Sequence, residues 1–393
     1  MDASKPPVRT ATRRQVLAFG GRATAALAAS TVWPLPARAA RDNELNIYAW
    51  EGYHADSVVA PFAKAFRCDV GRELITSDPE AVNRLRAGET AIWDLVTLNN
   101  PWARKVLFPN GLIVALDRDR FEPDGDRVLP RFRAPYKWAT SADGLSLLGV
   151  AQRFGPFSFV VNTDHISRAL AEDQGFDLFL DPAMKDRYGI LAYDNWNVLH
   201  ICIAAGFSPF RRHSAAELEN FGEIARLLLG NARLMTDDAT IINTAIIHGE
   251  IDAYFSGGTY TASGVRYDGL DHIRGITPRR GPIDGKGGIV WSEITSTVAN
   301  PELSPRAYDF LDYVQHPEVA KRVAFAEGTY NPIAQMGDPL VFRQFSLAEL
   351  EAIQWPDLED DLARCVDYDI NPDYEAMLAL YNTAKLKRAE SRA

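Results

Sequence analysis

Short strand-like runs alternate with amphipathic helical patterns along most of the chain, and this alternation limits the fold more than any other feature. The first strand-like run covers 45–50, and apolar residues at helical spacing follow it between Val58 and Phe66. Further strand-like runs lie at 93–98, 145–150, 157–161, 189–193, 251–255 and 288–298. The pattern predicts an α/β fold in which mainly parallel sheets are flanked by helices.

Signals for helix starts agree with this prediction. Ser77–Glu80 has the pattern of a capping box with an early proline, and Ser214–Glu217 has a second capping box. Gly88 is expected to end the first of these helices. Ser304-Pro305 and His316-Pro317 are expected to begin two more. No long flexible linker divides this region, so two domains would be joined by short crossover segments.

The first forty residues have the features of an export signal. Arg13-Arg14 precedes a weakly apolar stretch rich in alanine and glycine, from Val16 to Val32, and Ala37-Arg38-Ala39 has the A-x-A pattern of a cleavage site. A twin arginine before such a stretch is typical of Tat signals. Residues 1–40 are therefore interpreted as a Tat-type signal peptide, with the Tat machinery as a partner. The mature protein is expected to be periplasmic, without a membrane-spanning helix.

Composition and motifs exclude several classes of function. The net charge of −10 and the lack of a basic cluster argue against nucleic-acid binding. Cys68, Cys202 and Cys365 are far apart, which excludes common zinc and iron–sulfur spacings, so no metal and no cofactor is predicted. They could form one disulfide or remain three thiols. No catalytic motif of a known hydrolase or nucleotide-binding enzyme occurs in a suitable context, so no catalytic residue and no enzyme activity is predicted.

Aromatic and polar side chains follow several of the predicted strands. In α/β folds, ligands bind at the carboxyl ends of the strands. Aromatic faces attract alkylammonium groups and pack against methylene chains, and carboxylates pair with the ammonium charge. These strand ends therefore predict a site for a small amine. The residues concerned are Trp50, Tyr53, Asn99, Trp102, Asp194, Asn197, Trp291, Glu293 and Tyr330.

The order of these motifs resembles the spermidine/putrescine-binding proteins of bacterial ABC importers. The resemblance covers nearly all of residues 44–336. It rests on the pattern Leu-x-Ile-Tyr-x-Trp-x-x-Tyr at 45–53 and on the segments 94–96, 249–251, 287–291 and 317–321. It implies a two-lobed periplasmic binding protein fold of type II, which closes on its ligand by a hinge motion and carries out no catalysis. It also implies a polyamine ligand and a membrane permease as partner, and the protein is expected to be a monomer.

The resemblance also implies lobe boundaries and residue roles. One lobe is expected to contain 41–153 and 258–333, and the other 154–257 and 334–393. Aromatic rings would enclose the methylene chain of the ligand, and carboxylates would hold its ammonium groups. The aromatic positions are Trp50, Tyr53, Trp102, Trp291 and Tyr330, the carboxylates are Asp194 and Glu293, and Asn99 is a small polar contact.

Three positions depart from the family pattern. Asn197 stands where the family often has a glutamate, and Ser256-Gly257-Gly258 stands where it often has a tryptophan, with Tyr260 as the nearest aromatic residue. Arg153 stands where neutral or aromatic residues are usual. In the cleft Arg153 would repel a polycation and could pair with a ligand carboxylate, whereas a solvent-facing Arg153 would have no such role.

These departures leave three hypotheses open. The first is the binding of a polyamine for import. The second is the same transport role for a zwitterionic or acidic amine metabolite that is bound through Arg153. The third is a Tat-exported periplasmic enzyme, because Tat export often serves proteins that carry cofactors.

Overall fold

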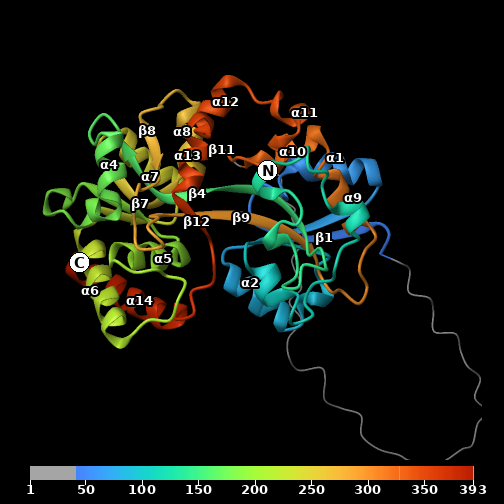
Figure 1. The fold of residues 1–393 in the computed structure, drawn as a ribbon, viewed down its shortest axis with the longest axis horizontal. Helices are drawn as coiled ribbons and strands as arrows, with labels where there is room; N and C mark the ends of the chain where they lie inside the picture. The colour runs from blue at the N-terminus through green and yellow to red at the C-terminus, as the bar shows by residue number, and fades with distance from the viewer. Residues whose placement is uncertain (1–40, 327, 393) are drawn as a thin grey trace, which may run out of the picture. The chain divides into compact units, whose positions relative to one another are not determined.

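The computed structural model describes residues 41–326 and 328–392. The segment 1–40, interpreted above as an export signal, lies outside these ranges. The described residues belong to one compact unit, which contains a ten-stranded sheet surrounded by helices (Figure 1). Within these ranges no helix is long and apolar enough to cross a membrane.

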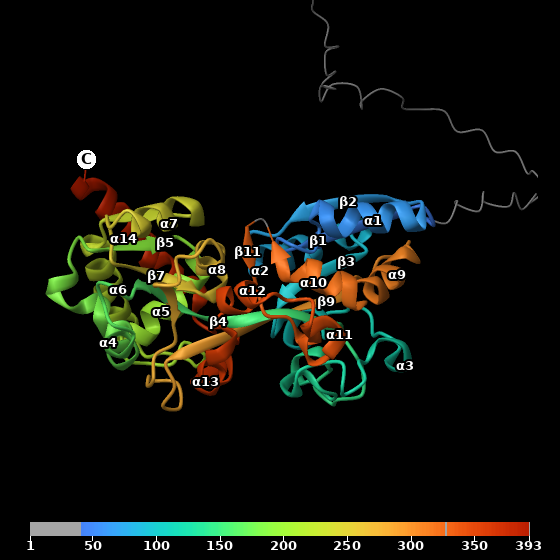
Figure 2. The ribbon, with the colours of Figure 1, turned by 90° about the horizontal axis from the view of Figure 1, so that it is seen from above.

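Two long strands in the middle of the sheet connect its two parallel parts. β1 is parallel to β2 and β3, and β5 is parallel to β6 and β7, as the sequence predicts. β4 and β9 are antiparallel to each other and run between these parts, which the sequence did not predict (Figure 2). The order is β2 (Asp69–Leu74), β1 (Glu44–Ala49), β3 (Leu95–Asn99), β9 (Gly288–Thr297), β4 (Val150–Asn162), β7 (Ala253–Gly258), β5 (Tyr188–Leu191) and β6 (Leu234–Thr236), with β12 (Cys365–Asp367) on β9 and β8 (Ile273–Ile276) on β4.

β4 corrects the prediction of separate strands at 145–150 and 157–161. It is one strand of 13 residues, and 145–149 precede it as irregular backbone in which Leu145 is 75% exposed. The pairing of β4 with β9 shifts register between Ala151 and Phe154. Such a bulge bends a strand and redirects the side chains beside it. The sequence signal was broken at this bulge, where the polar Gln152 and Arg153 interrupt the apolar pattern.

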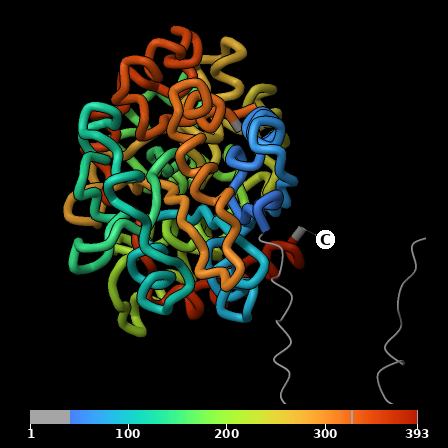
Figure 3. Tube along the Cα trace, turned by 90° about the vertical axis from the view of Figure 1, so that its right-hand side faces the viewer, coloured from blue at the N-terminus to red at the C-terminus, as the bar shows by residue number. Residues whose placement is uncertain are grey.

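Helices gather around each parallel part, and we call the two assemblies the first and the second lobe. Figure 3 shows α9 and α10 beside α1, although they are far apart in the sequence. The first lobe contains β1–β3 with α1 (Asp56–Phe66), α2 (Asp78–Arg86), α9 (Arg306–Tyr313) and α10 (Pro317–Ala324). The second contains β5–β8 with α4 (Arg168–Gln174), α5 (Asp194–Ala204), α6 (Ala215–Asn231), α7 (Ala239–Ile247), α8 (Thr259–Tyr267) and α14 (Tyr374–Arg392).

Shorter elements complete the chain. The hairpin of β10 (Phe325–Ala326) and β11 (Thr329–Tyr330) precedes α11 (Pro339–Phe342), α12 (Leu347–Ala352) and α13 (Leu358–Ala363), and α3 (Arg118–Phe121) lies before β4. A π-helical turn covers Ala103–Leu107, and 3-10 turns cover Glu89–Ala91, Pro130–Phe132, Lys137–Ala139, Gly175–Leu180, Pro182–Met184, Ala334–Gly337 and Trp355–Asp357. The predicted lobe boundary at 153/154 falls inside β4. α8 and β8, which are assigned here to the second lobe, lie in the segment 258–333 that was predicted for the first lobe.

The helices begin where the sequence predicts, but one predicted capping contact is absent. α6 begins with the predicted capping box, in which Ser214 and Glu217 bond to each other's backbone N–H groups. α9 and α10 begin at the predicted prolines, and Gly88 follows the end of α2 with φ +108°. α2 begins where expected, but the Ser77 side chain makes no capping bond. The prediction of a capping box at Ser77 is therefore wrong, and Asp78 makes other contacts.

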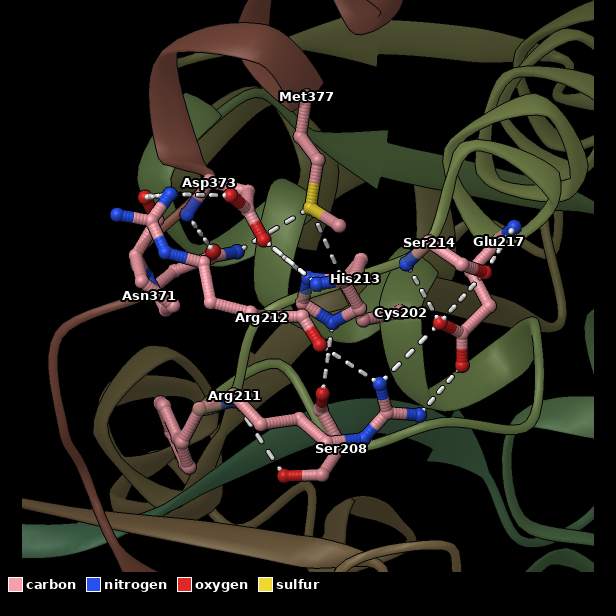
Figure 4. A network of polar contacts seen from close by, with 12 residues as sticks. Cys202, Ser208, Arg211, Arg212, His213, Ser214, Glu217, Asn371, Asp373 and Met377 are labelled. Carbon is pink, nitrogen blue, oxygen red and sulfur yellow. Dashed lines mark hydrogen bonds and ion pairs between the residues drawn. The ribbon is translucent and has the colours of Figure 1, made fainter.

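A partly buried polar network joins the start of α14 to the second lobe (Figure 4). His213 Nδ1 lies 2.9 Å from an Asp373 carboxylate oxygen, and its Nε2 lies 2.9 Å from the Ser208 carbonyl oxygen. The Cys202 thiol lies 3.4 Å from the Met377 sulfur. The structure contains three buried free thiols, Cys68, Cys202 and Cys365. The sequence left open one disulfide or three thiols, and the structure has three thiols.

Candidate functional site

The strand pairing brings the ends of the parallel strands in both lobes to the middle of β4 and β9. Asn99, the last residue of β3, lies opposite Glu293 on β9. Gly155 on β4 lies opposite Trp291, and Phe157 lies opposite Gly258 at the end of β7. The residues that follow β1, β3 and β7 are therefore neighbours in space, as expected for a ligand site in an α/β fold.

A buried ion pair forms the centre of this region. Arg153 Nε donates to Glu293 Oε2 at 3.1 Å and Nη2 donates to Oε1 at 3.3 Å, so both charged groups are held by two parallel bonds. The Arg153 side chain is only 1% exposed and that of Glu293 only 5%. The bulge in β4 places Arg153 across from Glu293, inside the protein and away from solvent. The solvent-facing alternative for Arg153 is therefore excluded.

Tyr53 and Glu51 complete the surroundings of the guanidinium. The Arg153 carbon Cζ lies 5.4 Å from the centre of the Tyr53 ring, and the Tyr53 hydroxyl accepts the Arg153 backbone N–H at 3.2 Å. Arg153 Nη1 donates to the Glu51 carbonyl oxygen at 2.5 Å, and Nη2 lies 3.9 Å from the Glu51 carboxylate. Two carboxylates thus share one guanidinium.

Burial and charge act in opposite directions on these groups. Burial raises the pKa of Glu293 to about 7, although the charge of Arg153 lowers it. Burial alone would lower the pKa of Arg153, but the nearby Glu293 and Glu51 outweigh it and the pKa is raised. Arg153 is therefore always charged, whereas Glu293 gains its proton more readily than an exposed glutamate.

Tyr260 connects the second lobe to this pair. It lies in the first turn of α8, and its hydroxyl donates to the Glu51 carboxylate that follows β1. Its ring meets Trp291 edge to face, with 6.3 Å between ring centres. Tyr193, which precedes α5, lies beside Tyr260, and burial raises its pKa to about 12. Glu51 and Tyr193 were not among the predicted residues, although Glu51 directly follows Trp50 at the end of β1.

Asp78 organises a second group of predicted residues. The Trp50 indole Nε1 donates to Asp78 Oδ1 at 2.9 Å, and Asn99 donates to Oδ2 from its side chain at 2.9 Å and to Oδ1 from its backbone at 3.3 Å. Trp102 lies close enough to Asp78 to favour its charged form, and its indole Nε1 has no hydrogen-bond partner among the described residues. Burial raises the pKa of Asp78, and these hydrogen bonds oppose the rise. Sequence reasoning missed Asp78 because it lies inside the segment Ser77–Glu80, which was interpreted as a helix start with Ser77 as its cap.

Tyr368 extends this group toward the second lobe. It follows β12, and its carbonyl oxygen accepts from Asn100 Nδ2 at 3.1 Å. Its hydroxyl accepts from Asn195 Nδ2 in α5 at 3.2 Å, and its ring centre lies 5.3 Å from that of Trp196. No sequence pattern marked Tyr368, because a single tyrosine far down the chain reaches the strand ends only through the fold.

Three predicted site residues, Asp194, Asn197 and Tyr330, make contacts outside the groups around Arg153 and Asp78. Both carboxylate oxygens of Asp194 lie 3.1 Å from the Lys385 ammonium on α14. Asn197 is completely buried, and its Nδ2 donates to the Leu191 carbonyl and the Tyr381 hydroxyl at 3.0 Å each. Tyr330 packs against Tyr267 and Phe325, with 4.8 Å between ring centres in both pairs. Within the described ranges, no group of three His, Cys, Asp or Glu side chains is arranged to hold a metal ion.

Comparison with solved structures identifies the fold. No protein-family model matches the chain. A putative spermidine/putrescine ABC transporter from Listeria monocytogenes is 16% identical and aligns with a TM-score of 0.65 over 88% of this chain and 99% of that chain. The spermidine/putrescine substrate-binding protein PotD from Streptococcus pneumoniae is 15% identical over the same shares, with a TM-score of 0.61.

A third match has a different ligand. The binding protein MotA from A. tumefaciens B6, solved in complex with glucopine, is 13% identical over 87% of this chain and 99% of that chain, with a TM-score of 0.58. The three matches share an architecture with this chain at low sequence identity. The resemblance found in the sequence is thus confirmed at the level of the fold, and the chain has the two-lobed α/β fold of type II periplasmic binding proteins.

Proposed function

We propose that this protein is the ligand-binding component of an ABC importer and that its ligand is a small organic amine. The proposal rests on the carboxylates and aromatic rings that come together where the strand ends of the two lobes meet. There the carboxylates of Glu51 and Glu293 share the single guanidinium of Arg153, and the carboxylate of Asp78 accepts hydrogen bonds from the neutral Trp50 and Asn99. Aromatic rings lie beside these groups. Excess negative charge beside aromatic faces is a suitable environment for an alkylammonium group.

Polyamines are the first class of amine to test. Two of the matching structures are described as spermidine/putrescine transport proteins, which supports the class that the sequence resemblance implies. Under this proposal the aromatic residues Trp50, Tyr53, Trp102, Trp291 and Tyr260 contact the methylene chain. The carboxylates Asp194 and Glu293 would release Lys385 and Arg153, respectively, to hold the ammonium groups.

A zwitterionic or acidic ligand has less support. That hypothesis needs the Arg153 guanidinium to be free for a ligand carboxylate. In the structure the guanidinium is buried and bonded to Glu293 at 3.1 and 3.3 Å. An acidic ligand would have to displace Glu293 and leave a buried carboxylate without its partner, which is costly.

A hydrogen-bonded pair of Ser256 and His200 is the structural feature that bears on the enzyme hypothesis. Ser256 Oγ lies 2.8 Å from His200 Nδ1, and His200 Nε2 lies 3.1 Å from the Phe157 carbonyl oxygen. Burial lowers the pKa of His200 to about 3. Both side chains are completely buried among aromatic rings. The pair fits a packing role between α5 and β7.

A thermal-shift screen of the purified full-length chain tests the proposed function. The screen contains polyamines, amino acids, monoamines and small acids, since a ligand that binds only the folded state raises the melting temperature. We expect amines to raise it and acids without an amine to leave it unchanged. Mass spectrometry of the recovered ligand should show no chemical change. A chemically altered ligand, or no shift with any solute, would contradict the proposal.

The transport role includes export and a membrane partner. We propose that residues 1–40 direct the protein to the periplasm through the Tat machinery and that a permease receives the ligand there. Replacing Arg13 and Arg14 together with lysine should prevent export, because Tat recognition depends on the arginine pair. Cell fractionation measures this, with the single exposed change Arg127→Lys as a control. Export of the double variant at the wild-type level would contradict the Tat assignment.

A further inference from the structure

The carboxylates that are candidates for binding an ammonium group differ in whether the protein itself supplies a cation. Glu293 has Arg153, with two bonds to the guanidinium. Glu51 lies 3.9 Å from the same guanidinium and accepts the Tyr260 hydroxyl. Asp194 has the Lys385 ammonium, 3.1 Å from both of its oxygens. These three carboxylates are therefore neutralised, fully or in part, from within the chain.

Asp78 is different because its partners are neutral. Its hydrogen bonds come from the Trp50 indole and from the side chain and backbone of Asn99. Among the described residues no lysine, arginine or histidine forms an ion pair with it. The side chain is almost fully buried, with 1% of the residue exposed. A buried carboxylate without a counter-ion is costly, and a cation brought to it would relieve that cost.

The surroundings of Asp78 suit an organic cation. Trp50 and Trp102 lie beside the carboxylate. Tyr368 is near enough for the negative charge of Asp78 to contribute to its raised pKa. Tyr368 in turn is bonded to Asn100 of the first lobe and to Asn195 of the second, so the aromatic wall is built from both sides of the molecule. Aromatic rings beside a carboxylate stabilise an ammonium group and pack against its carbon chain.

We infer that the ligand carries one ammonium group, that Asp78 receives it, and that Arg153 and Lys385 occupy the places where further ammonium groups would pair. This inference rests on the proposed function and narrows it from amines in general to monocationic amines. A diamine would have to displace one of two internal cations to pair its second charge. A monoamine would pair with Asp78, which is the one of these four carboxylates without a counter-ion among the described residues.

Titration calorimetry on the full-length protein tests the inference with butylamine and putrescine, which have the same carbon chain and differ in the second ammonium group, and with spermidine. We expect butylamine to bind about tenfold more tightly than putrescine. Asp78→Asn should weaken butylamine binding by about tenfold or more, because it removes the charge and keeps the shape. Asp124→Asn changes the same charge at an exposed position, where the side chain is 82% exposed, and should leave binding unchanged.

A second variant tests the role of Arg153 as an internal counter-ion. Arg153→Gln frees the Glu293 carboxylate, so we expect putrescine to gain about tenfold in affinity while butylamine changes little. The preference of the unmodified protein for monoamines over diamines checks the inference even if Asp78→Asn does not fold.

The outcomes separate this inference from the proposed function. Tighter binding of putrescine or spermidine than of butylamine by the unmodified protein, or butylamine binding that Asp78→Asn leaves intact, would overturn the inference and keep the transport role. Binding of acids alone would overturn it as well. No binding of any solute would remove the proposed function, and the inference with it.

Discussion

At the scale of single residues, the structure gives Arg153 and Asp78 roles that differ from those inferred from the sequence. The sequence marked Arg153 as a departure that could repel a polycation or bind an acid. Its pairing with Glu293 makes it an internal cation instead. Asp78 had no predicted role beyond its place in the expected capping box Ser77–Glu80, but its side chain holds Trp50 and Asn99 in place. Both roles depend on neighbours that are distant in the sequence.

The ion pair of Arg153 and Glu293 gives a stability prediction. Glu293→Gln leaves the buried guanidinium without its main partner, so we expect a loss of about 3 kcal/mol in the free energy of unfolding. Replacing both residues with apolar side chains of similar volume, Arg153→Met with Glu293→Leu, should cost less than the two single changes added together. Urea denaturation measures Glu293→Gln, the double variant and its two single variants. Additive effects would show that the pair is not coupled.

Asp361 gives a pH prediction. Burial raises its pKa to about 6, above the value of about 4 in an unfolded chain. The native state therefore holds this proton more tightly than the unfolded state, and the contribution of Asp361 to stability falls as the pH rises from about 4 to about 6. Asp361→Asn should gain about 1 kcal/mol over the wild type at pH 8 and nothing at pH 4. The exposed neighbour Asp360→Asn should show no such dependence in denaturation curves.

At the scale of elements, local patterns predicted helix starts better than strand limits. α6, α9 and α10 begin where the sequence indicates, because capping groups and prolines act within a few residues. β4 was divided into two predicted strands, since the bulge near Arg153 interrupts the apolar pattern. β2 was missed because it is an edge strand whose residues are mostly exposed and polar.

The two serines before α2 and α6 provide a matched test of capping. Ser214→Ala removes the side-chain bond to the Glu217 backbone N–H and should cost about 1 kcal/mol of stability. Ser77→Ala removes no capping bond, so its cost should be a few tenths of a kcal/mol at most. Thermal or urea unfolding of both variants measures the difference. Equal losses would show that the contact at Ser214 contributes nothing.

At the scale of the whole molecule, contacts between the lobes gather at the candidate site. Tyr260 of α8 reaches Glu51 beyond β1, and Tyr368 bonds to both Asn100 and Asn195. The two lobes are thus held together by the residues proposed to surround the ligand. A hinge motion that separates the lobes would open these contacts, so ligand binding and lobe closure would be coupled.

Tyr260→Phe tests this coupling. The change removes one hydrogen bond to a charged group between the lobes and keeps the ring against Trp291. We expect ligand affinity to fall about tenfold, since closure loses a bond of this strength. Tyr267→Phe lies on the same helix, away from Glu51, and should leave affinity unchanged. Calorimetry with the amine selected by the thermal-shift screen measures both, and equal affinities would show that this bond does not stabilise closure.

The sequence by itself determined the α/β class, the helix starts and the aromatic and polar strand ends. These features depend on spacing and capping within short segments, which the order of residues specifies directly. The pairing of Arg153 with Glu293, the contacts of Asp78 and the position of Tyr368 were decided only by the tertiary structure. Each brings together side chains from different strands, and their charges act on one another only at the short distances and low exposure that the fold creates.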